Sequence, residues 1–436
     1  MTDETSMANP QANPEQAENL VIEESFAELV EQVLSGQPQP VDMEQIEHAL
    51  DELWRRVAAA QASPEQPTPQ LTITRAHAVN MVVFVKDRAQ IERVDQALKD
   101  LALNKPARAI VLVEQEEPGL EAGGNGPTAP SELQAWIATL CHRPDPAWPY
   151  VCSERVTIAA PRALITELHS AVVSLFVSDV PSVLWWCAPL PEEAEERHLF
   201  SRLAGNVDLL VFSAGAFRAP LKDLQRLPDL AQEEIPGLPA ISELTWLGIH
   251  PWREMVARPF DDPEHRALLP YVESVTVRYV AGGDVRRRQF QPVAPALLVA
   301  WLAERLAWRT VMPLRFSPQG IGACEFAAEF QPYVSVELIP AALPGAAPGT
   351  IIGVELNAHR VSPGRDAGGR FRMERLGDGS WVRTLVRIQG QVRLERIAQF
   401  RGASVGELLA QVVGQLAPDT IFLRVLEKLA EMQGPA

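Results

Sequence analysis

The stretch AVNMVVFVKDRAQIERVDQALKDLALNKPARAIVLVEQ, residues 78–115, decides the fold. It begins with an apolar run, continues with apolar residues at helical spacing, and ends with a second apolar run. A strand, a helix and another strand in this order form a parallel pair, because the helix returns the chain to the end of the sheet where the first strand began. Strands that are apolar throughout are buried on both faces. The stretch therefore predicts a parallel sheet between two layers of helices.

The same alternation of strands and helices continues to about residue 263. Further apolar strands are YVCSERVTIAA (150–160), VPSVLWWCA (180–188) and VDLLVFSA (207–214), and helices are predicted between them at ITELHSAVVSLFV (165–177) and EEAEERHLFSRLAG (192–205). Repetition of this unit is typical of an α/β domain with a mostly parallel, Rossmann-like sheet and helices on both faces. We predict such a domain over residues 70–265.

After this domain the pattern changes. Segments such as VESVTVRYVAG (272–282) and RFRMERLG (370–377) alternate in polarity and follow one another with glycine turns, which indicates antiparallel hairpins. We predict an α+β domain with antiparallel hairpins and C-terminal helices over residues 266–436. For the N-terminal part we predict an acidic, largely disordered extension with one amphipathic helix over residues 1–36, then a helix and a Pro/Gln linker over residues 37–69.

The charges of the chain are unevenly distributed. The first 54 residues hold thirteen Asp or Glu and no Lys or Arg, whereas residues 278–401 hold seventeen Arg, no Lys and ten acids. Two surfaces match the charge of this acidic N-terminal segment: the basic part of this chain, which the segment would cover, and a basic surface on a partner. The net charge of −17 disfavours binding to nucleic acid. No apolar run is long enough to cross a membrane and the acidic start lacks the features of a secretion signal, so we expect a cytoplasmic protein.

No sequence motif indicates a catalytic, cofactor or metal site. The glycine cluster GGNGPT (123–128) lacks the Lys-Ser/Thr of a phosphate-binding loop, and Gly320-x-Gly322 lacks the third glycine of a dinucleotide-binding turn. We therefore expect no enzyme, no cofactor and no metal. The four cysteines are too few for a disulfide framework. Cys152 and Cys187 form a candidate redox pair if their strands are neighbours; the alternative is that all four are reduced and pack as small apolar side chains.

Aromatic and arginine residues supply the candidate binding sites. Trp185 and Trp186 lie at the C-terminal end of a strand, the edge where α/β sheets meet ligands and partners, and they point to opposite faces. Trp246, Trp252 and Arg253 are of the types that dominate interface hot spots. Core packing is the alternative, and it is stronger for the adjacent pair than for Trp252. Clustered arginines suit a phosphate or an acidic partner, with simple exposure to solvent as the alternative; they are Arg286, Arg287, Arg288, Arg365 and Arg370.

Three segments resemble one known family. DVPSVLWW (179–186), ELTWLGIHPWREMVARPFDDP (243–263) and WLAERLAWR (301–309) are similar to segments of the glucose-6-phosphate dehydrogenase assembly protein family, OpcA, of cyanobacteria and actinobacteria. The resemblance covers most of the chain, from about Asp42 to Gln399. Glu243 departs from it, because we expect Asp at that position.

The resemblance implies a non-enzymatic protein that binds glucose-6-phosphate dehydrogenase, favours its active oligomer and raises its activity in the oxidative pentose phosphate pathway. In the cyanobacterial branch it also implies a link to thioredoxin-dependent redox control. The alternative function is a sensor of a sugar phosphate or a nucleotide, with a pocket between the tryptophan pair and an arginine cluster.

Overall fold

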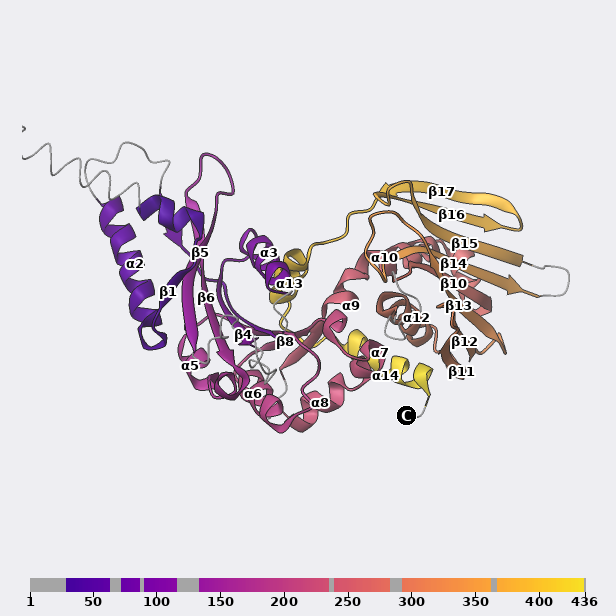
Figure 1. The fold of residues 1–436 in the computed structure, drawn as a ribbon. Coiled ribbons are helices and arrows are strands. Elements are labelled where there is room, and N and C mark those ends of the chain that lie inside the picture. Colours follow the sequence, from indigo (N-terminus) through magenta and orange to yellow (C-terminus); the bar gives the residue numbers. More distant parts are fainter. Residues whose placement is uncertain are drawn as a thin grey trace, which may run out of the picture.

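The computed structural model describes residues 29–62, 72–86, 90–115, 133–234, 239–282, 292–361 and 367–434. This part of the chain forms two sheets, with helices around and between them (Figure 1). Most of the predicted acidic extension and the predicted Pro/Gln linker lie outside the described residues. Residues 29–35 are helical and lead into the first strand.

The elements carry the labels of Figure 1. The strands of the first sheet are β1 (Gln39–Val41), β2 (Ile73–Arg75), β3 (Val79–Val85), β4 (Ala107–Gln115), β5 (Gln134–His142), β6 (Tyr150–Pro161), β7 (Ser182–Cys187), β8 (Leu209–Phe212) and β9 (Ala240–Glu243). Those of the second sheet are β10 (Val272–Val280), β11 (Arg309–Phe316), β12 (Gly322–Ala327), β13 (Val334–Ala341), β14 (Ile351–Arg360), β15 (Ala367–Leu376), β16 (Trp381–Ile388) and β17 (Gln391–Gln399). The helices are α2 (Ile46–Gln61), α3 (Ile91–Ala102), α4 (Arg162–Ile165), α5 (His169–Ser174), α6 (Ala194–Ala204), α7 (Pro220–Gln225), α8 (Leu227–Glu234), α9 (Leu244–Gly248), α10 (His250–Ala257), α11 (Pro263–Arg266), α12 (Val293–Arg305), α13 (Val405–Val413) and α14 (Thr420–Gln433).

The first sheet is parallel at its centre. Its neighbouring strands run in the order β6-β4-β3-β7-β8-β9, and every adjacent pair in this series is parallel. If β3 is counted as the first strand, this is the order 3-2-1-4-5-6 of the doubly wound dinucleotide-binding fold. At the other edge, β5 pairs antiparallel with both β6 and β1. The predicted mostly parallel sheet is confirmed.

Helices cover both faces of the first sheet because its central strands are apolar on both sides. On one face, α2, α5 and α6 pack over residues such as Phe84 and Trp186. On the other face, α3 and α13 pack over residues such as Val83 and Trp185. All seven residues of β3 are buried, as the unbroken apolar run predicts.

The second sheet follows the order β11-β12-β13-β10-β14-β15-β16-β17. Its neighbours are antiparallel, as predicted, except for the parallel pair of β10 and β13. Burial alternates along its strands; in β13, Val334, Val336 and Leu338 are buried whereas Ser335 and Glu337 are exposed. One face therefore faces the core, and the other is polar.

One apolar core continues from the first sheet to the second. Helix α12 is buried along most of its length, which fits its apolar composition, and it packs against α9, α14 and two strands of the second sheet (Figure 1). Helix α13 lies beyond the second sheet in sequence but packs against α3. The C-terminal helices therefore contact both halves of the molecule, and the predicted domain limits at residues 36, 69 and 265 stay predictions.

Candidate partner-binding surface

Trp185 and Trp186 pack in the two apolar layers on either side of β7. The ring of Trp186 stacks on Phe84 with 4.2 Å between centroids and meets Phe200 edge-on at 5.0 Å. Trp185 is 4% exposed, and its Nε1 donates a hydrogen bond to Ser213 Oγ at 3.0 Å. A side chain without accessible surface cannot contact a partner. We therefore correct the predicted binding role of this pair, because both residues form the core.

Trp246 and Trp252 are also buried, and the partly exposed Arg253 lies against Trp246. Trp246 Nε1 donates to Asp419 Oδ2 at 2.8 Å, and its ring stacks on Phe422 of α14. The guanidinium of Arg253 lies over the Trp246 ring, 3.5 Å from its centroid. Burial lowers the pKa of Arg253 to about 10, against the opposing effect of Asp419. Trp252 is buried. The structure therefore gives this segment a role in attaching α9 and α10 to the last helix. This corrects the predicted partner contact of the two buried tryptophans, whereas that of Arg253 stays a prediction.

The predicted approach of Cys152 to Cys187 does not occur. Cys152 lies in β6 directly opposite Cys141 of β5, and these two form a disulfide. Strands β4 and β3 stand between β6 and β7, which separates the two strands by roughly 14 Å. Cys187 and Cys324 are buried and unpaired. The sequence did not identify Cys141 as the partner because β5 was not predicted.

Of the five predicted arginines, the structure places only Arg370, which lies in β15. Arg286, Arg287, Arg288 and Arg365 lie outside the described residues. Because Trp185 and Trp186 are buried, they do not line the pocket that was predicted for a sensor between the tryptophan pair and an arginine cluster.

The second sheet has a partly exposed face opposite helices α12 and α14, and we call it the outer face. In β15, Arg370, Arg372 and Glu374 belong to the outer face, whereas Phe371 and Met373 are buried between them. The alternation is visible in the sequence as RFRME, residues 370–374, and it is the signal from which this surface could have been predicted.

A carboxylate with three arginine partners, that of Glu374, lies on the outer face. Arg372 Nη2 is 2.6 Å and Arg278 Nη2 is 3.7 Å from Glu374 Oε2, and Arg383 donates hydrogen bonds to Oε1. Arg383 also lies 3.9 Å from Glu395 on the neighbouring strand. These residues come from four different strands, so the sheet holds them as an ordered pattern of charge.

Exposed apolar side chains flank these charges on the last two strands. Trp381 of β16 is 48% exposed and Ile397 of β17 is 55% exposed. Ile397 lies directly opposite Arg383 in the sheet. Trp and Arg are the side chains that most often dominate interface energetics. The outer face therefore exposes tryptophan and arginine, the residue types that we predicted to bind a partner, whereas the four tryptophans named in that prediction are buried.

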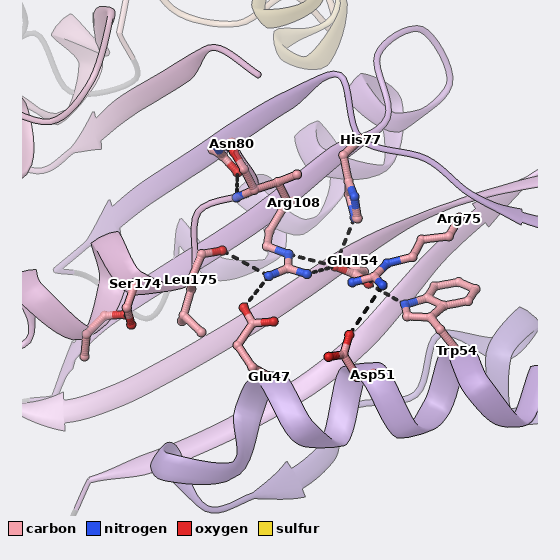
Figure 2. Close-up of polar contacts among 12 residues, drawn as sticks. Glu47, Asp51, Trp54, Arg75, His77, Asn80, Arg108, Glu154, Ser174 and Leu175 are labelled. Carbon is pink, nitrogen blue, oxygen red and sulfur yellow. Dashed lines mark hydrogen bonds and ion pairs between the residues drawn. The ribbon is translucent and has the colours of Figure 1, made fainter. Parts of the chain in front are cut away.

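A second charged cluster is buried at the N-terminal end of the parallel strands (Figure 2). Glu154 of β6 accepts hydrogen bonds from Trp54 Nε1 and from Arg108 Nε, the latter at 2.7 Å, and it forms ion pairs with Arg75 and His77. Burial alone would raise the pKa of Glu154, but the hydrogen bond from His77 and the charges of Arg108, His77 and Arg75 outweigh it and lower the pKa to about 2. The cluster has no sequence signature because its members come from four separate segments.

Two further acids connect this cluster to helix α2. Glu47 forms an ion pair with Arg108, and Asp51 Oδ1 lies 3.5 Å from Arg75 (Figure 2). The cluster thereby ties α2 to β2, β4 and β6, and its role is structural. Among the residues that the structure describes, no three His, Cys, Asp or Glu side chains are grouped to hold a metal ion. In the same part of the chain, none of the helices is long and apolar enough to cross a membrane.

Two family models match the chain in succession. Residues 98–229 match the model described as glucose-6-phosphate dehydrogenase subunit N-terminal domain, and residues 239–426 match the corresponding C-terminal domain. A relative named OxPP cycle protein OpcA, from Nostoc punctiforme, is 29% identical over 337 residues, which are 74% of this chain and 64% of that protein. A relative of the same name from Synechococcus elongatus is 26% identical, over 64% of this chain and 59% of its own length. The chain thus spans less than two thirds of these relatives.

Solved structures with a similar arrangement are dehydrogenases and other oxidoreductases. Glucose-6-phosphate 1-dehydrogenase from Mycobacterium avium superposes with a TM-score of 0.47 and 10% identity, over 83% of this chain and 93% of that one. An oxidoreductase from Sinorhizobium meliloti gives a TM-score of 0.45 and 8% identity, over 81% and 95% of the two chains. From the two successive model matches and the named relatives, the chain belongs to the OpcA family of glucose-6-phosphate dehydrogenase assembly proteins.

Proposed function

We propose that this chain is a non-enzymatic assembly factor that binds glucose-6-phosphate dehydrogenase, favours its active oligomer and raises its activity in the oxidative pentose phosphate pathway. The observation that carries this proposal is the match to two successive models that are both described as parts of a glucose-6-phosphate dehydrogenase subunit. The relatives are named for the OxPP cycle, which points to the same pathway.

The turn after β3 supports a role other than hydride transfer. In the doubly wound fold, the turn after the first strand carries G-x-G-x-x-G, whose glycines let the backbone approach the pyrophosphate of a dinucleotide. The sequence at this place is KDRAQI, residues 86–91, without a glycine. The order of the strands is therefore that of a dinucleotide-binding sheet, whereas the sequence that follows β3 lacks the glycines that would admit the dinucleotide.

We place the docking surface for the dehydrogenase on the outer face of the second sheet. Trp381 and Ile397 would supply apolar anchors, and the surrounding arginine and glutamate side chains would fix the orientation of the partner through their charges. The buried tryptophans of the first sheet would support this function only through the stability of the fold.

Mixing the chain with a glucose-6-phosphate dehydrogenase from the same organism tests the proposal. We expect a complex of defined mass by light scattering and a higher catalytic rate at saturation. The double variant Trp381→Ser, Ile397→Ser should weaken association by about 2–4 kcal/mol, the scale of a hot spot. Trp148→Ser is the matched control, because Trp148 is 61% exposed but lies near the start of β6 in the first sheet.

The possible outcomes test the assembly function and the position of the docking surface separately. No complex and an unchanged rate across a saturating titration would refute the assembly function. A complex that is weakened by Trp148→Ser but not by the double variant would keep the function and move the docking surface to the first sheet.

The implied link to thioredoxin stays a prediction. In this chain the bond available to a dithiol reductant is Cys141–Cys152, because Cys187 and Cys324 are buried and unpaired. If the link holds, the chain reduced by thioredoxin and the oxidised chain should activate the dehydrogenase to different extents. Equal activation by both forms, with the thiol content verified, would count against redox control.

A further inference from the structure

A hollow of about 510 Å³ lies at one end of the outer face. This volume is in the usual range for small-molecule sites. The hollow is at the end of β15 and β16 away from Trp381, beside the turn between β16 and β17. The side chains that decide its chemistry are Ser274, Asn357, His359, Arg370, Arg387 and Gln389.

The hollow exists because glycines replace larger side chains at its floor and rim. Gly368 lies directly opposite His359 in the pair of β14 and β15. A Cβ atom at Gly368 would be 3.9 Å from His359 Cδ2, an ordinary contact, so the strand would accept a side chain there. Gly390 forms part of the rim with a φ of 80°, in the region that favours glycine. A β-branched side chain at the position of Gly368 would fill part of the hollow.

Two arginines on neighbouring strands line this hollow. Arg370 and Arg387 are directly opposite in the antiparallel pair of β15 and β16. Like charges in directly opposite positions destabilise a sheet. Glu273 is the only carboxylate residue among those that line the hollow. Glu355 approaches Arg370 at 3.5 Å, but it also lies 3.8 Å from Arg372. An anion between the two guanidinium groups would remove their repulsion.

A chain of hydrogen bonds holds one of these arginines in place. Arg370 Nε donates to Asn357 Oδ1 at 3.0 Å, and Asn357 Nδ2 donates to Ser274 Oγ at 3.1 Å. The contacts of Arg370 thus engage its Nε, which leaves its two Nη groups without a partner among the described residues. The exposed guanidinium of Arg387 has no hydrogen bond or ion pair within the described part of the chain. Four N–H groups of Arg370 and five of Arg387 are therefore available on residues that line the hollow.

We propose that this hollow binds the phosphate group of a small phosphorylated metabolite, with Arg370 and Arg387 as its paired ligands. A guanidinium donates two parallel hydrogen bonds to a phosphate, and two of them match the charge of a phosphate monoester. The amide and imidazole groups of Asn357, His359 and Gln389 line the rest of the volume and suit the hydroxyl groups of a sugar. The site needs no second protein, so it is independent of the proposed assembly function.

Calorimetry on the full chain without dehydrogenase tests this site, with inorganic phosphate, glucose 6-phosphate and uncharged glucose as probes. We expect both phosphates to bind, glucose 6-phosphate more tightly, and glucose not to bind. Arg387→Gln should weaken phosphate binding about tenfold or more, and its exposed position should leave thermal unfolding unchanged. Arg396→Gln on β17 is the control, because Arg396 is also exposed but does not line the hollow.

A second variant tests the volume separately from the charge. Gly368→Val should fill the hollow, and so weaken glucose 6-phosphate more than inorganic phosphate. Equal affinities of the wild type and Arg387→Gln, equal losses in Arg387→Gln and Arg396→Gln, or no binding of either phosphate at millimolar concentration would overturn the proposal. Tighter binding of inorganic phosphate than of glucose 6-phosphate would overturn the assignment to a sugar phosphate.

Discussion

Glu154→Gln should remove the charge on which the buried cluster of the first sheet depends. The pKa of Glu154 is about 2 in the folded chain, against an ordinary value of 4.5, and this lowering stabilises the folded state by about 3 kcal/mol at neutral pH. Because this pKa is lowered, the contribution is fully present above about pH 4.5 and is lost as the pH falls towards 2. The variant also leaves Arg108 and Arg75 without their central partner.

Urea unfolding at pH 7, 5, 4 and 3 measures this contribution. The free energy of unfolding of Glu154→Gln should be about 3–5 kcal/mol lower than that of the wild type at pH 7. The gap should narrow below about pH 4.5, because Glu154 there takes up a proton in the unfolded wild-type chain while it stays ionised in the folded one. Glu47→Gln is the control. Glu47 also pairs with Arg108 but is 45% exposed, so this substitution should lower the free energy of unfolding by less than about 1 kcal/mol. Equal losses in both variants, or a gap that is independent of pH between 5 and 3, would refute the reasoning.

Three further predictions concern packing and thiols. Gly406→Ala should destabilise the fold by about 1–3 kcal/mol, because its Cβ would lie 2.3 Å from a backbone oxygen of α3, whereas Gly402→Ala meets no atom within 4 Å and should be neutral in thermal unfolding. Trp186→Ala should cost about 3–5 kcal/mol in urea unfolding, since this side chain is fully buried. Burial raises the pKa of Cys187 well above its usual range and that of Cys324 to about 12, so neither thiol should react with a disulfide reagent at pH 8 until the chain is unfolded.

The sequence predicts the first sheet well because its signal is local. The run at 79–85 and the helix that follows have the composition and period of a buried strand and an amphipathic helix, whatever the rest of the chain does. Strand β5 was missed, because it joins β6 through a hairpin without a helix between them and so lies outside the repeating strand–helix pattern. The disulfide was missed with it, since the pairing of Cys141 follows from the register of β5.

The candidate site was harder to predict because residue type does not reveal exposure. Tryptophan is common both in cores and in interfaces, so Trp186 and Trp381 have the same chemistry in the sequence and opposite environments in the structure. The opposition of Arg370 and Arg387 depends on the register between β15 and β16. The alternation of charged and apolar residues in β15 can be recognised in the sequence, because successive side chains of a strand point to opposite faces of the sheet.

Because α13 covers α3, this side of the first sheet stays incomplete until α13 has been synthesised. Roughly 300 residues separate the end of α3 from the start of α13, which at about 5–20 residues per second corresponds to about 15–60 seconds on the ribosome. Throughout this interval the side of α3 around Ala97 and Leu101, where Gly406 later docks, has no cover from α13. The nascent chain therefore exposes this apolar surface until α13 is made, and we expect it to be a client of ribosome-associated chaperones.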